Sequence, residues 1–336
     1  MFRSTQEIPN LVAQVIVRHT SAARQELTAE EDSKRRSRPQ TSSSRLSAMS
    51  ASSNRAFRLV SLGGEMDNDI FDTEGLTIMT CYNLLFQSNG EYFVYHIDGN
   101  DYDYSPEGMR LYFESASLVP PEYYRAKIPP ALADGSPPTA APLGSAMDPD
   151  VYLKISGPRG YDPTIDPAQL EEFTQAKIQL QELRICEILR ASPHPNICRY
   201  LGYLRHADGV HIAGLCFQRH VKNLRALVEE LPEGEVLPLE TCVRIMDGIE
   251  SGLRHLHGLG FAHNDLNPEN VMLDKFGQAV VIDFDSCVEI GASMSGNQGT
   301  TFGWEYENTG ISKAENDLWA LSEIARWLGG KRTYYP

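Results

Sequence analysis

Two short polar segments, close together in the second half of the chain, limit its possible folds more than any other feature. The first is HNDLNPEN at 263–270, and the second is VIDFD at 281–285, which places Asp283 thirteen residues after Asn270. The apolar stretch 271–273 follows the first segment and 279–282 leads into the second, which predicts two short strands joined by a turn. Carboxylate and amide groups are therefore expected at the ends of buried strands, where a fold holds functional side chains firmly.

These residues, together with Lys154 and Glu182, match the chemical requirements of phosphoryl transfer from ATP. A carboxylate and an amide hold divalent ions against the triphosphate, and a second carboxylate orients the attacking hydroxyl. A lysine steadied by a glutamate anchors the phosphates. The chain supplies these parts in the order Lys154, Glu182, Asp265, Asn270 and Asp283.

Around these residues, periodicity predicts alternating strands and helices. A helix start is indicated by Asp166-Pro167-Ala168-Gln169, which has an Asp N-cap, a proline at the first helical position and a Gln at the third. Apolar spacing continues this helix to Leu189, and His194-Pro195-Asn196-Ile197 is expected to turn the chain back. Strands are predicted at 151–155, 199–204 and 209–217, and further helices at 242–256 and 317–328.

The first half of the chain falls into three predicted segments. Residues 1–55 form a serine-rich basic tail that cannot bury enough apolar surface to fold, and its KRRSR run at 34–38 is either a solvated patch or a nuclear-import or docking signal. Residues 56–128 are expected to be β-rich: 91–97 reads as a strand that follows an Asn-Gly turn and pairs with 77–86. Residues 98–108 are acidic but lack the glycine and glutamate of a calcium-binding EF-hand loop. The proline-rich stretch 129–149 predicts a linker or a long irregular loop.

Charge and composition exclude several classes of protein. The 336 residues include 30 Lys+Arg and 45 Asp+Glu, and 41% are hydrophobic, too many for a chain disordered throughout. Residues 1–58 carry ten basic and five acidic side chains, so the remaining 278 carry 20 and 40, a net charge of −20 that argues against non-specific nucleic-acid binding. No apolar run is long enough to span a membrane or to act as a secretory signal, so we expect no membrane partner. The six cysteines form no CxxC pair, which favours reduced thiols in an intracellular protein, cytoplasmic or nuclear.

Residues 150–328 resemble the eukaryotic protein-kinase superfamily and are most similar to fungal serine/threonine kinase-like proteins. VYLK stands at the position of the family's strand lysine, HNDLNPEN at H-R-D-L-x-x-x-N and DFD at D-F-G. PHPNI, GLCF, a GT..GW segment and ENDLWALSEI with Asp317 add to the likeness. The resemblance implies an α+β bilobal fold, with a β-rich upper lobe at 150–217 and a helical lower lobe at 218–336 that is shortened after its anchoring helix.

The resemblance also implies roles for individual residues. Asp265 would be the catalytic base, Asn270 and Asp283 the Mg²⁺ ligands, and Lys154 with Glu182 the ion pair on the phosphates of ATP. Glu187 is an alternative partner for Lys154, although the helical phase favours Glu182. The hinge between the lobes would present the adenine with residues near 217–221, among them Phe217, Gln218 and His220. His263 is expected to be a structural hydrogen-bonding residue beneath the loop.

Five departures from the family pattern qualify these expectations. No G-x-G-x-x-G precedes Lys154, which puts the phosphate-covering loop in doubt. Asn264 replaces the arginine of H-R-D, so no dependence on a phosphorylated activation loop is expected. Asn267 replaces a lysine, which removes one positive charge, and Asp285 replaces the glycine of D-F-G, which restricts the backbone. There is no A-P-E motif; Glu307 is its nearest equivalent, and the chain ends soon after the anchoring helix.

Three functions remain open on the sequence. The first is an ATP-dependent protein kinase acting on serine or threonine of an unidentified protein substrate. The second is a pseudokinase that serves as a binding module, favoured by the missing glycine loop and by Asn267. The third is a small-molecule kinase of the aminoglycoside or choline phosphotransferase type, which also uses H-x-D-x-x-x-x-N and needs no peptide platform.

Overall fold

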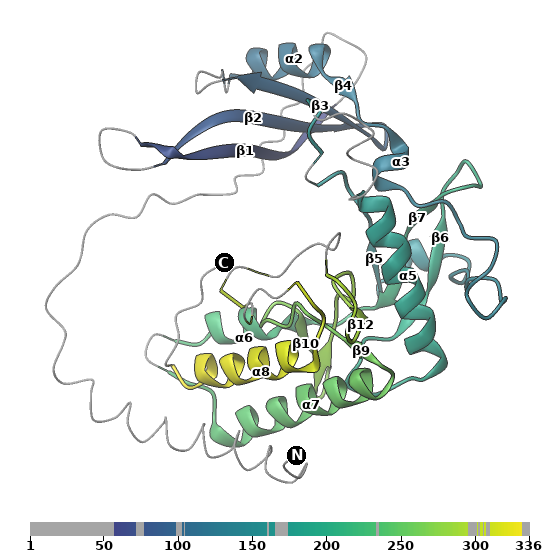
Figure 1. Cartoon of the computed structure of the whole chain (residues 1–336), viewed down its shortest axis with the longest axis vertical. Helices are drawn as coiled ribbons and strands as arrows, with labels where there is room; N and C mark the ends of the chain where they lie inside the picture. The colour runs from purple at the N-terminus through teal and green to yellow at the C-terminus, as the bar shows by residue number, and fades with distance from the viewer. Residues whose placement is uncertain are drawn as a thin grey trace, which may run out of the picture. The chain divides into compact units, whose positions relative to one another are not determined.

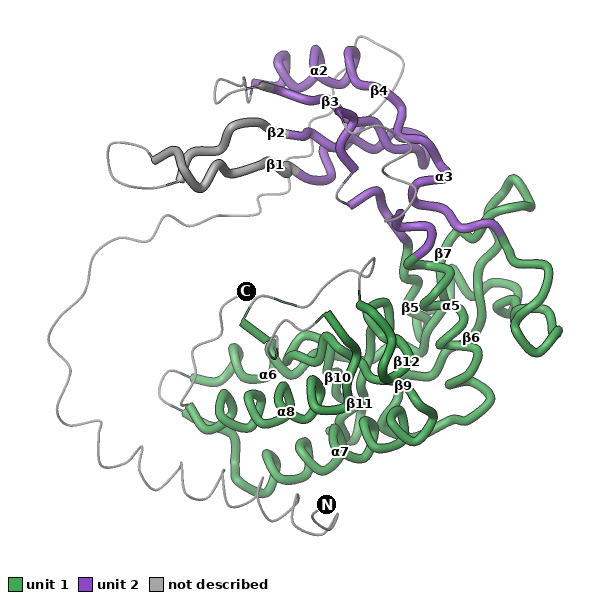
Figure 2. Tube along the Cα trace, viewed as in Figure 1, with its two compact units in different colours: residues 1–35, 128–155, 178–336 green, residues 36–127, 156–177 purple. Residues whose placement is uncertain are grey.

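The computed structural model describes residues 57–71, 77–98, 103, 105–159, 161–164, 174–232, 235–294, 301, 303–304, 306 and 310–330. The predicted tail at 1–55, the helix start at Asp166 and Glu307 lie outside these residues. Within the described part, the chain forms two compact units (Figure 2). The smaller unit contains residues up to Lys127 together with Ser156–Lys177, and the larger contains Ile128–Ile155 and the chain from Ile178 onward.

The smaller unit is built on an antiparallel sheet in the order β1 (Arg58–Phe71), β2 (Thr77–Ser88), β3 (Glu91–Asp98) and β4 (Ser117–Leu118). The predicted hairpin of β2 and β3 is present, and Asn89 and Gly90 both have the positive φ that such a tight turn requires. The β-rich character expected for 56–128 is therefore confirmed. The sequence did not predict helix α2 (Pro106–Ser115), which the side chain of Ser105 caps, or the short α3 (Pro121–Tyr124).

Both faces of this sheet are covered by apolar side chains, because successive residues of a strand point to opposite sides. One apolar cluster contains Leu84 and Phe86 with Met109 and Phe113 of α2. The opposite cluster contains Leu85, and it is closed by residues of β3, α3 and neighbouring segments, namely Tyr92, Val94, Val119, Tyr123 and Tyr124. The last residues of the acidic segment 98–108 accordingly form the start of α2, which packs on the sheet.

The larger unit begins with a second antiparallel sheet, in the order β5 (Val151–Lys154), β7 (Ile212–Gln218), β6 (Tyr200–Arg205). Helix α5 (Gln175–Ala191) lies beside this sheet (Figure 1). Each of these elements had been predicted, although β7 starts at Ile212 rather than 209 because Gly209 lies in the turn after β6.

The proline-rich segment before β5 is irregular, as expected, and it is anchored to this sheet. The backbone of Thr139 and Ala141 hydrogen bonds with Tyr203 of β6, and the Thr139 hydroxyl donates to Glu187 of α5 over 2.8 Å. Gly202 makes the close approach possible: its φ is +132°, and a Cβ there would lie 2.5 Å from the backbone nitrogen of Ala141. The 3-10 turn η1 (Ser145–Met147) then leads into β5.

The rest of the larger unit is mainly helical, with α6 (Leu224–Glu229), α7 (Leu239–Gly258) and α8 (Ala314–Leu328). Helix α7 packs against α8 and against two short strands, β9 (Phe261–Ala262) and β11 (Ala279–Val281). The remaining strands are β8 (Lys222–Asn223), β10 (Val271–Leu273) and β12 (Val288–Glu289); β10 pairs with both β8 and β11, and β12 pairs with β9. Helix α8 begins three residues before its predicted start at Asp317.

The fold is therefore mixed α/β with a β-rich N-terminal region, while the shortened helical lobe stays a prediction. The side chains of Cys186, Cys198, Cys216, Cys242 and Cys287 are buried and free of disulfides. None of the helices in the described ranges combines the length and the apolar character needed to cross a bilayer.

Candidate active site

The larger unit brings Lys154 and three carboxylates together. Lys154, at the end of β5, places its Nζ 2.8 Å from Oε1 of Glu182 on α5. The same Nζ lies 2.6 Å from Oδ1 of Asp283 and 3.2 Å from Oδ2 of Asp285, both in the loop after β11. Glu187, the alternative partner for Lys154, instead binds Thr139 and Arg190.

The charges of this cluster perturb one another. Burial disfavours the Lys154 ammonium, but the carboxylates, Glu182 first, outweigh burial and hold the pKa of Lys154 well above its usual range. Burial raises the pKa of Glu182 to about 7, and Lys154 counteracts this only in part because it is shared among three acids. Burial also raises the pKa of Asp285, whereas for Asp283 the attraction of Lys154 overcomes burial and lowers the pKa. The single ammonium of Lys154 thus stabilises the ionised form of Asp283 most, and the cluster keeps an excess of negative charge.

The backbone at Asp283 is held in an uncommon conformation. Its φ is +66°, in the left-handed region that non-glycine residues rarely adopt. Phe284 next to it is fully buried and contacts the ring of His263 edge-on, which anchors the loop. Strain of this kind persists only where the surrounding structure imposes it, and it is common at functional sites.

Asp265 lies in the loop between β9 and β10, where several donors surround its carboxylate. Oδ1 accepts hydrogen bonds from both the backbone N–H and the hydroxyl of Thr301, each over 2.7 Å. Oδ2 accepts from Nδ2 of Asn270 over 3.0 Å. Burial raises the pKa of Asp265, although the Thr301 donors act in the opposite direction.

Asn270 and Asn267 are buried beside this carboxylate. Nδ2 of Asn270 donates to Asp265, so its Oδ1 is the oxygen left for a cation. Asn267, where the kinase pattern has lysine, donates to the Thr301 hydroxyl over 3.0 Å and accepts from the backbone N–H of Glu269. It therefore holds the loop together and brings no positive charge to it.

The fully buried His263 lies beneath the loop, as expected. Its Nε2 donates to the carbonyl of Ile282 over 2.9 Å, and its Nδ1 accepts from the backbone N–H of Asp265 over 3.3 Å. This pattern assigns the proton to Nε2. The imidazole thus links the Asp265 loop to the residue that precedes Asp283.

Asp317 of α8 supports the same loop from below. Its carboxylate is completely buried and accepts the backbone N–H groups of His263 and Asn264, each over 2.8 Å, and Nε2 of His257 over 2.7 Å. Asn264 needs this support because its φ is +63°. A buried carboxylate that accepts several donors fixes backbone geometry strongly.

The side chain of Asn264 fills the position of the H-R-D arginine with a neutral group. It is 4% exposed, and its Nδ2 donates to the carbonyls of Ala262 and Ser286 and to the hydroxyl of Ser312. Its Oδ1 accepts from Asn316. Every polar atom is used within the protein, so the residue offers no cation to a phosphate.

We therefore expect any ATP turnover by this chain to be the same before and after treatment with a broad-specificity phosphatase. The reason is that no arginine at 264 links the Asp265 loop to a phosphorylated residue. Turnover of radiolabelled ATP measures this, with intact-mass spectrometry to verify that phosphate has been removed. A strong loss of turnover on dephosphorylation would contradict the expectation.

Of the residues predicted for the hinge, Phe217 and Gln218 end β7 and His220 follows it. Phe217 is buried and Gln218 is exposed, and the backbone N–H of Gln218 donates to Arg199. The backbone of His220 makes no hydrogen bond among the described residues, which leaves one donor and one acceptor available. Burial lowers the pKa of the His220 imidazole, so the neutral ring is favoured.

Two functional candidates were not identified from the sequence. Thr301 was noted only as part of a GT..GW segment, yet it gives Asp265 two hydrogen bonds. For Asp285 the sequence predicts only a restriction on the backbone, yet its side chain contacts Lys154 directly. The GT..GW segment indicates the region of Thr301 but not the residue itself, and nothing local in the sequence pairs residue 285 with residue 154.

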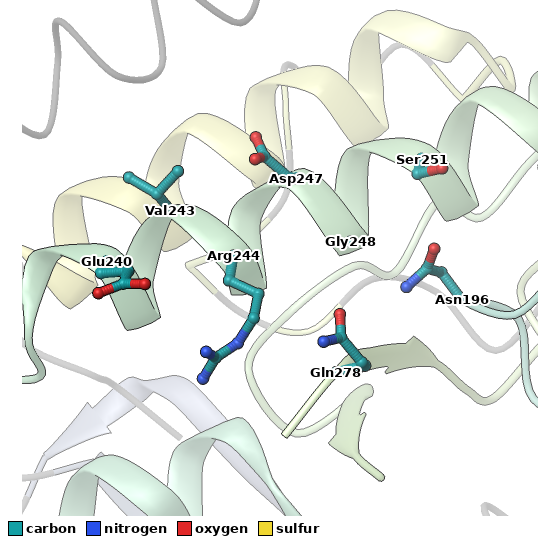
Figure 3. A pocket seen from close by; sticks show the side chains of 8 residues that line it. All are labelled: Asn196, Glu240, Val243, Arg244, Asp247, Gly248, Ser251 and Gln278. Carbon is teal, nitrogen blue, oxygen red and sulfur yellow. The ribbon is translucent and has the colours of Figure 1, made fainter. Parts of the chain in front are cut away.

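A separate open groove of about 430 Å³ runs along α7 (Figure 3). Its lining is mostly polar and includes Asn196, Glu240, Arg244, Asp247, Ser251 and Gln278. None of the predicted site residues borders it. The groove is thus distinct from the Lys154 cluster, which is defined by its ion pairs.

Comparison with known proteins agrees with this geometry. Residues 166–322 match the protein kinase domain family, a range that includes Glu182, Asp265, Asn270 and Asp283 but not Lys154. Mouse "Serine/threonine-protein kinase 16" is 31% identical over 128 residues, which cover 34% of this chain and 40% of the mouse protein. "Cytokinesis protein sepH" of Emericella nidulans is 26% identical over 199 residues, covering 57% of this chain and 14% of the fungal protein.

Both of these relatives are therefore matched over less than half of their own length. Among solved structures, the yeast RNA Pol II CTD kinase CTDK-1 complex matches with 18% identity and a TM-score of 0.41, over 54% of this chain and 55% of that one. The family match and these relatives show that the chain carries a protein kinase domain over residues 166–322, which is distantly related to serine/threonine kinases.

Proposed function

We propose that this chain is an ATP-dependent protein kinase that transfers the γ-phosphate of Mg-ATP to serine or threonine. The observation that carries the proposal is the Lys154–Glu182 ion pair in direct contact with Asp283. A chain without nucleotide chemistry has no need to bury an ammonium among acids, since burying charges costs free energy. The serine/threonine kinases among its relatives support the substrate class.

The donor set at the site suits Mg²⁺. The Asp283 carboxylate, whose side chain is 33% exposed, and Oδ1 of Asn270 are hard oxygen ligands of the kind that Mg²⁺ prefers. Within the described residues, no group of three or more His, Cys, Asp or Glu side chains could hold a metal ion by itself. This is consistent with Mg²⁺, which is commonly held by one or two protein oxygens plus substrate phosphates and water. When bound, the ion would neutralise charge on the transferred phosphoryl group.

The remaining residues have distinct parts in the proposed reaction. Lys154 steadies the α- and β-phosphates, and Glu182 orients Lys154 from α5. Asp265 accepts or orients the proton of the attacking hydroxyl, and its raised pKa brings it nearer to that of an effective base at neutral pH. The free donor and acceptor of the His220 backbone are the groups that would bind the adenine.

A thermal-shift titration of the full chain tests the nucleotide and metal assignment. With ATP at about 100 times its Kd, binding stabilises the folded state by about 2.7 kcal/mol, which corresponds to a rise in Tm of roughly 5–10 °C. We expect this rise with Mg²⁺ in the wild type and its loss in Asp283→Ala. The three tryptophans at 304, 319 and 327 all lie in the larger unit, so their fluorescence reports on the part that contains the site.

Asp247→Ala is a matched control, because Asp247 is an exposed acid on α7 away from the Lys154 cluster. It is expected to retain the full shift. An unchanged magnesium-dependent shift in Asp283→Ala would overturn the metal assignment. No shift in the wild type at millimolar ATP would overturn the proposal that this chain uses ATP.

A pseudokinase is the second candidate, and one observation favours it. In the described residues β5 pairs only with β7, so no glycine-rich hairpin extends the sheet beside Lys154. The thermal-shift titration separates the two functions in part, because a pseudokinase that has lost ATP binding gives no shift. A pseudokinase that still binds ATP is recognised by its lack of turnover.

A further inference from the structure

We propose that Asp285 is a positioning residue that makes phosphate binding at Lys154 conditional on a divalent cation. This inference rests on the proposed function, in which Lys154 receives the phosphates of Mg-ATP. It concerns the residue that replaces the glycine of D-F-G, whose side chain is 12% exposed and lies 3.2 Å from the Lys154 ammonium.

The first step of the argument is the number of donors on Lys154. A lysine ammonium has three N–H donors. In this structure Nζ of Lys154 has three carboxylate partners, Glu182, Asp283 and Asp285. No donor is left over, so a phosphate oxygen can bind Lys154 only by displacing one of these carboxylates.

The second step is the charge of the cluster. With all three carboxylates ionised, the cluster carries a formal net charge of −2, and it still carries −1 when Glu182, whose pKa burial raises to about 7, is protonated. Among the described residues, Lys154 is the only Lys or Arg that forms an ion pair with any of these three acids. Asn267, where the kinase pattern has lysine, is neutral and buried. The negative cluster therefore repels a triphosphate that carries no cation, and little positive charge nearby offsets this repulsion.

The third step is that the three acids differ in how exposed they are and in how firmly the fold holds them. Glu182 is anchored on α5, and its side chain is 3% exposed. Asp283 is 33% exposed, and the two aspartates lie on either side of the buried Phe284, both within reach of Nζ. A cation that approaches from solvent can draw Asp283 and Asp285 away from Lys154, while Glu182 stays in place. Lys154 then regains donors for phosphate and keeps its orienting partner.

Removing Asp285 is accordingly expected to weaken the coupling between cation and nucleotide. In Asp285→Ala one donor of Lys154 is free and one negative charge is gone, so ATP binds without metal more readily. Asp285→Asn removes the charge but keeps an acceptor, and it is expected to show a smaller effect. Thermodynamic couplings between two ligands are typically 5–150-fold, so we expect a change of about tenfold.

The test is calorimetric titration of ATP into the full chain, in EDTA and in Mg²⁺, for the wild type, Asp285→Ala, Asp285→Asn and the control Asp247→Ala. The expected result is a metal-free affinity about tenfold higher in Asp285→Ala, with a correspondingly smaller gain on adding Mg²⁺. Asp247→Ala, which removes the same charge from an exposed site, is expected to behave as the wild type. A metal-free affinity in Asp285→Ala equal to or weaker than that of the wild type would overturn the role of Asp285.

A second measurement needs no nucleotide. Acylation of Lys154 by an amine-reactive reagent, followed by mass spectrometry, is expected to be several-fold faster in Asp285→Ala because one ion pair fewer protects the amine. If the wild type binds no ATP with or without Mg²⁺, the proposed function fails. The acylation rates alone then show whether Asp285 occupies a donor of Lys154. Equal rates in the wild type and the variant would then overturn its hold on Lys154.

Discussion

An Asp265→Asn variant is expected to bind Mg-ATP as the wild type does and to turn it over about 10²–10⁴-fold more slowly, the usual contribution of a positioned general base. The carboxylate of Asp265 does not contact Lys154, and the residue is only partly buried. An amide of the same size keeps the hydrogen bonds of Oδ1 but cannot accept a proton from the attacking hydroxyl. Its NH₂ group replaces the Oδ2 acceptor, so the side chain of Asn270 loses one bond and keeps the one to the backbone carbonyl of Asp265, over 2.8 Å. Nucleotide binding, which also rests on Lys154 and Asp283, is expected to stay near the wild-type level.

Turnover of radiolabelled ATP, to water or to the chain itself, measures this effect without a known substrate. Thr301→Ala is an informative companion, since it removes one hydroxyl bond to Asp265 and one to Asn267 but leaves the carboxylate. We expect it to lose far less activity than Asp265→Asn. Wild-type turnover in Asp265→Asn would contradict the assignment of the base, and no turnover in the wild type with intact ATP binding would favour a pseudokinase.

Individual helices and strands of this fold could be predicted because the spacing of apolar residues along the chain determines them. The apolar spacing of α7 and the alternation of the β2–β3 hairpin gave both the type of element and its approximate extent. The strand that bears Lys154 and the loop of Asp265 followed in the same way. Glu182 could be preferred over Glu187 because the helical phase places only one of them towards the sheet that bears Lys154.

What could not be predicted depends on contacts between distant residues. Thr301 binds Asp265 across 36 residues, and Asp285 binds Lys154 across 131. No periodicity relates such pairs, because only the folded backbone brings them together. The anchoring of the proline-rich segment is similar: its prolines indicated irregular structure, but the hydrogen bond from Thr139 to Glu187 depends on the packing of β6 and α5.

The second large effect is expected for stability, from the change Asp317→Ala. The buried carboxylate of Asp317 accepts three hydrogen bonds, from the backbone of His263 and Asn264 and from the ring of His257. Without it, two backbone N–H groups lose their acceptor inside the protein, and each unsatisfied buried donor costs about 1–3 kcal/mol. The φ of +63° at Asn264 loses its support as well. We expect a loss of about 3–5 kcal/mol in the free energy of unfolding, which lies within the combined cost of two such unsatisfied donors.

Urea unfolding followed by tryptophan fluorescence measures this loss, since all three tryptophans belong to the larger unit. Trp319 and Trp327 lie on α8 itself, so the signal comes from the helix that carries Asp317. His257→Ala separates the contributions, because it removes the ring donor and leaves the two backbone bonds intact; its cost is expected to be the smaller one. A midpoint for Asp317→Ala close to that of the wild type would mean that the Asp265 loop holds its shape without α8. Thr301, Asn270 and His263 would then have to supply the rigidity that a catalytic carboxylate requires.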